Sequence, residues 1–212
     1  MLFFLWATRG VPLLALAIAA PALGQVPPPP RPAVAPPAPA AGLCGDAALT
    51  GASVRTIVGE GGCGITAPVR VDTAAGVALD PPPTLDCSAA RALAEWLAEG
   101  AAPAFVERGV TVVGLTVLDA YSCRNRNRAA AGKLSEHGRG RAIDVGGFRL
   151  GDGATVTVRE GWASANWGPV LRRVHDAGCG PFSTVLGPEA NARHRDHLHL
   201  DTEERRRGPW CE

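Results

Sequence analysis

Six cysteines constrain the folding of this chain more than any other feature of its sequence. All of them lie after residue 42, and the first and last stand near the two ends of that part of the chain. An even number of cysteines in an exported chain implies three disulfides, for which fifteen pairings exist. No Cys-x-x-Cys motif occurs, which argues against a thiolate zinc site or a redox dithiol. We therefore expect a structural role for all six: Cys44, Cys63, Cys87, Cys123, Cys179 and Cys211.

The first 42 residues carry targeting and spacing signals. Residues 1–24 contain one charge, Arg9, followed by a short apolar run that ends in a small-x-small pattern. This predicts a secretory signal that is cleaved after Gly24, with an uncleaved membrane anchor as the alternative. Residues 25–42 are almost entirely proline and alanine, which predicts an extended polyproline linker. We expect a periplasmic or secreted protein without membrane contact after cleavage.

Residues 43–212 are long enough for one domain with its own core. The formal net charge of the chain is +1, which predicts no nucleic-acid partner. Asp86 or Ser88 can cap a first helix that Gly100 closes, and separated helices and short strands favour an α+β fold. We predict a small antiparallel sheet with flanking helices, stabilised by disulfides. The expected helices span 88–99 and 166–177, with a helical turn near Phe105, and the expected strands span 110–118, 142–145, 155–158, 182–186 and 197–201.

Histidine is scarce in this chain, yet four of its five copies fall in two short stretches beside carboxylates. His137 and Asp144 lie seven positions apart with two glycines between them, which lets a loop histidine approach an aspartate at the start of a strand. His197 and His199 share one face if they lie on a strand. His137, Asp144 and His199 can then supply one carboxylate and two imidazoles to a single Zn²⁺ ion with an open position for water.

The first stretch matches a known pattern in full. Ser-x-His-x-x-Gly-x-Ala-x-Asp runs from Ser135 to Asp144 and resembles the D-alanyl-D-alanine carboxypeptidase and dipeptidase family of zinc peptidases. Lysostaphin-type enzymes and the hedgehog signalling domain share that core. The resemblance implies that His137, Asp144 and His199 are the zinc ligands and that the fold is of this peptidase type.

The resemblance also implies catalytic roles. The last ligand of that family usually lies in Glu-x-x-His with the glutamate as general base, and Asp196 stands at that position here. The His-x-x-His-x-His spacing is similar to that of the penicillin-insensitive murein endopeptidases, in which the histidine two before the ligand takes part in catalysis. That position is His197, so the general base stays open between Asp196 and His197. Arg124 matches an upstream arginine that stabilises the oxyanion or grips the substrate, although a solvated basic loop is the alternative.

Several nearby residues have lesser expected roles. Asp201 can accept a hydrogen bond from a ligand imidazole, and His194 lies in a loop just outside the strand. Ser135 would orient the loop before His137, since a metal-bound histidine cannot also activate a serine. Surface positions are expected for Glu136, for His175 and for the tail at 205–207.

Over residues 43–212 the chain also resembles the bacterial extensin-like C-terminal family. The leading hypothesis for function is an exported zinc-dependent peptidase or amidase acting on peptidoglycan stem peptides. The alternative is a wall-binding or structural domain that keeps zinc without turnover, and a sugar-binding module without metal is weaker. The scissile bond and the oligomeric state stay open. Motifs at 61–64 (Gly-Gly-Cys-Gly), 120–124 (Ala-Tyr-Ser-Cys-Arg), 134–137 (Leu-Ser-Glu-His) and the His-Leu-Asp ending at 201 carry the resemblance.

Overall fold

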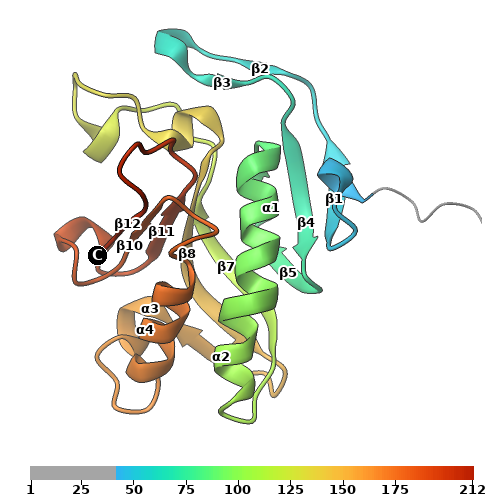
Figure 1. Cartoon of the computed structure of the whole chain (residues 1–212), viewed down its shortest axis with the longest axis vertical. Helices are drawn as coiled ribbons and strands as arrows, with labels where there is room; N and C mark the ends of the chain where they lie inside the picture. Colours follow the sequence, from blue (N-terminus) through green and yellow to red (C-terminus); the bar gives the residue numbers. More distant parts are fainter. Residues whose placement is uncertain (1–41) are drawn as a thin grey trace, which may run out of the picture. The chain divides into compact units, whose positions relative to one another are not determined.

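The computed structural model describes residues 42–212, so the predicted signal peptide and all but the last residue of the predicted linker lie outside the described residues. Most of the strands belong to one large sheet, and two short ones form a separate hairpin (Figure 1). The strands of the sheet are β1 (Leu49–Ser53), β4 (Val69–Ala74), β5 (Val77–Asp80), β6 (Thr84–Leu85), β7 (Val112–Asp119), β8 (Ala142–Leu150), β9 (Thr155–Thr157), β10 (Thr184–Leu186), β11 (Leu198–Asp201) and β12 (Trp210–Cys211). The hairpin consists of β2 (Ile57–Val58) and β3 (Gly64–Ile65).

The large sheet has ten strands in the order β1-β4-β5-β7-β8-β11-β10-β12, with β6 beside β4 and β9 beside β8. Neighbouring strands run antiparallel except for β5 with β7 and β10 with β12. The mixed α and β fold with a mainly antiparallel sheet is therefore confirmed. The expectation of a small sheet is wrong, because the strands β1, β4, β5 and β6, which the sequence did not predict, extend it.

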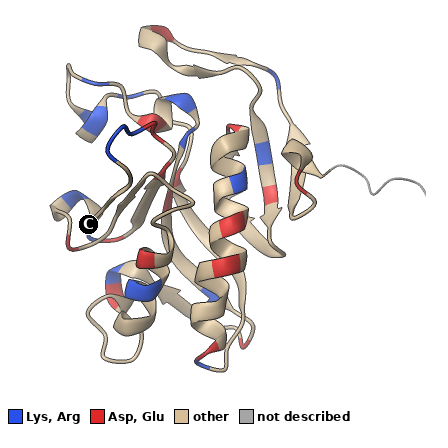
Figure 2. Cartoon of the chain, viewed as in Figure 1, with Lys and Arg blue, Asp and Glu red and all other residues tan. Residues whose placement is uncertain are grey.

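Two helical segments pack against the sheet. The first begins with α1 (Cys87–Trp96), where the carboxylate of Asp86 accepts the backbone N–H of Ala89 at 2.8 Å, so Asp86 is the cap. The other segment contains α3 (Val158–Gly161) and α4 (Gly168–Ala177). The outer side of α1 carries charged residues (Figure 2), as expected for a helix with one buried face.

Gly100 does not end the first helix. The backbone continues through a π-helical turn (Leu97–Ala101) into α2 (Ala102–Val106). A Cβ atom at Gly100 would lie 2.5 Å from the Cβ of Ala177 on α4. This glycine therefore serves a close approach of two helices rather than a helix stop.

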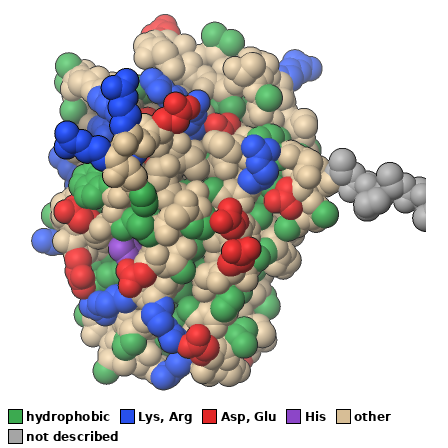
Figure 3. Space-filling model, in the orientation of Figure 1, with side chains coloured by type: hydrophobic (Ala, Val, Ile, Leu, Met, Phe, Trp, Pro, Cys, Tyr) green, Lys and Arg blue, Asp and Glu red, His purple; other side chains and the backbone are tan. Residues whose placement is uncertain are grey.

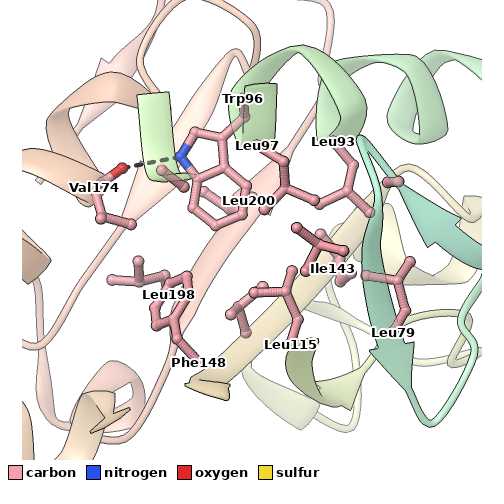
Figure 4. Packing of buried hydrophobic residues seen from close by; sticks show 14 of the residues in the cluster. Leu79, Leu93, Trp96, Leu97, Leu115, Ile143, Phe148, Val174, Leu198 and Leu200 are labelled. Atoms are coloured by element: carbon pink, nitrogen blue, oxygen red, sulfur yellow. Dashed lines mark hydrogen bonds between the residues drawn. The ribbon is translucent and has the colours of Figure 1, made fainter. Parts of the chain in front are cut away.

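The core lies between α1 and one face of the sheet (Figure 4). Trp96 is fully buried, and its indole N–H donates to the backbone carbonyl of Val174 at 2.9 Å, which joins α1 to α4. Burial of such apolar side chains contributes about 1.5–3 kcal/mol each. The side chains drawn around Trp96 are Leu79, Leu93, Leu97, Leu115, Ile143, Phe148, Leu198 and Leu200.

Alternation along β8 and β11 divides the residues between the two faces of the sheet. Ile143, Leu198 and Leu200 belong to the core, so the intervening Asp144 and His199 point to the other face. In the ladder His199 pairs with Asp144, and Leu200 pairs with Ile143. The strand register therefore places an imidazole directly across from a carboxylate.

β8 is longer than predicted. The sequence indicated a strand ending at Val145, whereas β8 continues to Leu150. Gly146 and Gly147 lie in this longer part of the strand, where the neighbouring strands leave little room for a side chain. A Cβ at Gly146 would lie 2.7 Å from the side chain of Leu118. The other predicted strands at 110–118, 155–158, 182–186 and 197–201 and the helix at 166–177 are confirmed with small shifts of their ends.

Three disulfides hold the described residues together, as the even cysteine count predicted. Cys44–Cys87 ties the chain before β1 to the start of α1, and Cys179–Cys211 ties the end of α4 to the last strand. Cys63–Cys123 joins the β2–β3 hairpin to the loop after β7. Among residues 42–212 no helix is both long and apolar enough to span a membrane.

Candidate metal centre

A pocket of about 450 Å³ lies on the sheet face opposite α1. Its floor is formed by side chains of β8 and β11 and of the short helical turn at Glu136–Arg139. Its rim is formed by the loop after β7, by the loop before β11 and by the C-terminal segment. Two stretches far apart in the sequence therefore meet in one concave site, the usual form of a small-molecule or substrate site.

His137, Asp144 and His199 are brought together at the floor of this pocket. The Nε2 atom of His137 lies 3.2 Å from Asp144 Oδ1 and 3.2 Å from His199 Nδ1, and His199 Nδ1 lies 2.8 Å from Asp144 Oδ1. All three side chains are mostly buried. One atom from each residue thus points to a common centre.

The position of His137 follows from the turn that carries it. Gly140 ends this turn with φ +67°, and a Cβ there would lie 2.2 Å from Ile65, so the turn needs a glycine. The Nδ1–H of His137 donates to the backbone carbonyl of Ala120 at 2.6 Å. This bond commits Nδ1 as the donor and turns Nε2 towards Asp144.

His199 is held in the same manner through its other nitrogen. Its Nε2–H donates to the carboxylate of Asp201 at 3.0 Å, which directs Nδ1 to Asp144. Burial alone would lower the pKa of His199, but the hydrogen bonds to Asp144 and Asp201 outweigh burial and raise the pKa to about 9. The predicted role of Asp201 as acceptor for a ligand imidazole agrees with this geometry.

Asp144 is a buried carboxylate between two imidazoles. Burial would raise its pKa, but hydrogen bonds from His137 and His199 hold the pKa well below its usual range. The carboxylate is therefore ionised, and its charge requires a positive partner in the cluster.

The three donor atoms fit a zinc ion. Tetrahedral Zn²⁺ with ligand distances of about 2.0–2.1 Å separates neighbouring ligand atoms by about 3.3 Å. The separations of 3.2, 3.2 and 2.8 Å among the three atoms lie close to this value. The outer hydrogen bonds to Ala120 and Asp201 are those that orient histidine ligands in zinc sites. The donor set and its outer contacts are consistent with one zinc ion.

His197 and Asp196 lie beside the cluster in different positions. His197 Nε2 lies 3.6 Å from the second oxygen of Asp144, and His197 Nδ1 lies 2.9 Å from Asp196. Asp196 also receives Arg159 at 2.7 Å and is partly exposed. The hydrogen bond from His197 is the main reason that the pKa of Asp196 is lowered. His197 therefore faces the three donor atoms, and Asp196 stands behind it.

Arg124 also lines the pocket. Its side chain is 18% exposed and its guanidinium donates to Asp119 at 3.0 Å, while its Nε has no hydrogen-bond partner among the described residues. Cys123, the residue before Arg124, forms a disulfide with Cys63 of the β2–β3 hairpin. This disulfide anchors the backbone at Arg124. Sequence analysis missed Asp119, although it follows directly on a predicted strand and can be recognised as a polar residue at a strand end.

The remaining predicted residues have mixed outcomes. His194 lines the pocket, its ring 5.3 Å from that of His197, and burial together with the nearby histidines lowers its pKa to about 4. Ser135 is buried and its backbone N–H donates to the carbonyl of Arg124, so its backbone joins the two loops.

Three expectations of surface positions are wrong or incomplete. Glu136 is 3% exposed, and burial raises its pKa. His175 is buried with its ring edge-on to Trp162; its Nδ1 lies 2.9 Å from a carboxylate oxygen of Asp176, and its Nε2–H donates to the backbone carbonyl of Glu212. Arg205 lines the pocket and donates to Thr184, so the tail at 205–207 is solvated only in part.

Comparison with known proteins gives one match. The model of a family described as "Extensin-like protein C-terminus" matches residues 44–212. No curated protein matches this chain. No solved structure matches it either.

Proposed function

This chain belongs to the extensin-like protein C-terminus family, and we propose that it is an exported zinc-dependent peptidase acting on the peptide stems of peptidoglycan. The convergence of His137 Nε2, Asp144 Oδ1 and His199 Nδ1 on one point carries this proposal. The resemblance of the Ser135–Asp144 motif to zinc peptidases supports a peptide substrate. The disulfides support an oxidising compartment, in line with the predicted signal for a periplasmic or secreted protein.

His137, Asp144 and His199 would hold the ion. When bound, zinc activates water as a nucleophile and polarises the carbonyl of the scissile amide. His197 takes the proton of the attacking water and passes it to the leaving amine, while Asp196 keeps the His197 ring oriented. Arg124 donates to the carbonyl oxygen as negative charge develops there. Asp119 holds Arg124 in place for this contact.

A second candidate is a wall-binding domain that keeps zinc without turnover. The contacts of Asp196 support this binding domain, because its carboxylate is bonded to His197 and to Arg159 and is not directed at the cluster. If His197 does not act as a base, the site lacks a free proton acceptor beside the donor atoms. The two candidates share the metal and the wall as partner, and they differ in turnover.

One experiment separates them. The oxidised protein is purified, its zinc content is measured, and it is incubated with intact sacculi and defined muropeptides beside a His199→Ala variant. We expect one zinc per chain and new muropeptides that the variant does not produce. Zinc with no new muropeptides would support the binding domain. Absence of zinc from the oxidised, folded protein would contradict both candidates.

A further inference from the structure

The rim of the pocket is rich in arginine. Figure 3 shows Lys and Arg side chains gathered over the part of the surface where the loop after β7 and the C-terminal loop lie. Three separate segments of the chain contribute these residues, although the net charge of the whole chain is only +1. Arginines that line the pocket are Arg124, Arg126, Arg128, Arg193 and Arg205.

Two carboxylates pair with three of these arginines. Asp119 receives Arg124 at 3.0 Å, and Glu203 receives Arg126 and Arg205 at 2.9 Å each. Lys133 also pairs with Glu203. Asp119 and Glu203 are therefore already paired, and neither is free to form a close ion pair with a further arginine.

Arg128 and Arg193 are the two arginines of the rim without a close carboxylate. Arg128 is 72% exposed, and its nearest acid, Asp119, is 3.8 Å away and already bound to Arg124. Arg193 has no acidic group within ion-pair distance among the described residues, and its Nη1 donates to the backbone carbonyl of Asn127 at 2.8 Å. This bond draws the loop before β11 towards the residue next to Arg128. Arg193 therefore contacts the residue next to Arg128, and both arginines line the same pocket.

We propose that Arg128 and Arg193 form an anion subsite that binds a carboxylate of the substrate. Guanidinium groups bind carboxylates through paired, charge-assisted hydrogen bonds, and neither Arg128 nor Arg193 has a close carboxylate partner among the described residues. The proposal rests on the proposed function for the identity of the substrate as a stem peptide, which carries free carboxylates.

The test uses the zinc-loaded full chain and three forms of one pentapeptide, L-alanyl-γ-D-glutamyl-L-lysyl-D-alanyl-D-alanine. One form is unmodified, one has the glutamate carboxylate amidated, and one has the terminal carboxylate amidated. Dissociation constants are measured by calorimetry, and mass spectrometry checks that each peptide is intact. If a peptide is cleaved, kcat/KM replaces the dissociation constant in the comparison.

One of the two amidations should weaken binding about tenfold or more, since it removes the charge from a charge-assisted hydrogen bond. Arg128→Gln and Arg193→Gln should each reduce that difference, and the double variant should abolish it. The matched control is Arg91→Gln on α1, whose guanidinium donates to the carbonyl of Cys44 away from the pocket. If Arg193→Gln unfolds the loop, Arg128→Gln still tests the subsite.

Equal binding of the three peptides, no binding of any of them, or a difference that persists in the double variant would each overturn the subsite. Inorganic phosphate is titrated in parallel, and binding of phosphate without the peptide carboxylates would also overturn it. Zinc content and muropeptide release are measured on the same preparations. Carboxylate selectivity without turnover would leave the subsite standing while contradicting the peptidase. Turnover without carboxylate selectivity would support the peptidase and contradict the subsite.

Discussion

Each of the two histidines in the cluster is fixed through the ring nitrogen that faces away from it. His137 uses the carbonyl of Ala120 and His199 uses the carboxylate of Asp201. These outer contacts hold both rings in place, so Nε2 of His137 and Nδ1 of His199 are turned towards Asp144 before any ligand binds. The spacing in sequence could not reveal Ala120, because its contact is made by a backbone carbonyl that any residue type could provide.

Asp201→Asn should weaken zinc binding about tenfold to a hundredfold while the protein stays folded, since the outer partner of a histidine ligand loses its charge. Competition with a chromophoric chelator measures the affinity. Asp152→Asn in the exposed β8–β9 turn serves as the control and should bind zinc as the unmodified protein does. An unchanged affinity for Asp201→Asn would show that Asp201 does not support the metal.

The position of His197 between Asp196 and the cluster predicts an order of effects on turnover. His197→Gln should lower kcat about a hundredfold or more, because proton transfer by a positioned base contributes about 10²–10⁴-fold. Asp196→Asn should lower kcat less, because it removes only the group that orients His197. Zinc content should stay unchanged in both. A larger loss of kcat in Asp196→Asn would instead assign the base to Asp196.

At the scale of elements, the candidate metal site depends on alternation along β8 and β11. The same strands supply Ile143, Leu198 and Leu200 to the core and the polar residues to the pocket. A slip of one residue would turn every side chain to the other face, so the core fixes the register of the site.

Leu200→Ala should therefore destabilise the protein by about 2–5 kcal/mol, as expected for a large-to-small change in a packed core. Leu200 is fully buried and lies in β11 between His199 and Asp201, two residues that line the pocket. Chemical denaturation of the oxidised protein measures the change. Val113→Ala, at a half-exposed position of β7, is the control and should stay within about 0.5 kcal/mol. A loss of stability of only about 0.5 kcal/mol in Leu200→Ala would contradict the conclusion that packing of this side chain in the core fixes the strand register.

Much of the second half of the domain could be predicted from sequence. The strand at 197–201 and the helix at 166–177 have strong patterns, and the spacing around His137 and Asp144 indicated their approach. The strands between residues 49 and 85 were not predictable, because β6 has two residues and β4 departs from strict alternation. The burial of Glu136 and His175 depends on partners far away in sequence, such as Glu212.

At the scale of the whole molecule, three disulfides cross-link the described residues. They close loops with sequence separations of 43, 60 and 32 residues. In the chain-entropy model each contributes about 4 kcal/mol by restricting the unfolded chain. Their sum is comparable with the whole stability of a domain, about 5–15 kcal/mol.

Reduction of the disulfides should consequently unfold the protein or lower its melting temperature sharply, whereas chelation of zinc should lower it modestly. Circular dichroism during heating, with and without dithiothreitol and with and without a chelator, measures both effects. The core and disulfides persist without metal, so the chelated, oxidised protein should unfold cooperatively. A larger fall in melting temperature with the chelator than with dithiothreitol would contradict the expectation that the disulfides contribute more stability than the metal.

We propose that His137, Asp144 and His199 hold one zinc ion. Zinc-edge X-ray absorption of the oxidised, zinc-reconstituted protein tests it most directly, together with metal analysis of His199→Ala. We expect one zinc per chain with two imidazole nitrogens and oxygen ligands at about 2.0–2.2 Å, and loss of the ion in the variant. Sulfur in the coordination shell, zinc retained by His199→Ala, or no zinc in the folded protein would contradict it.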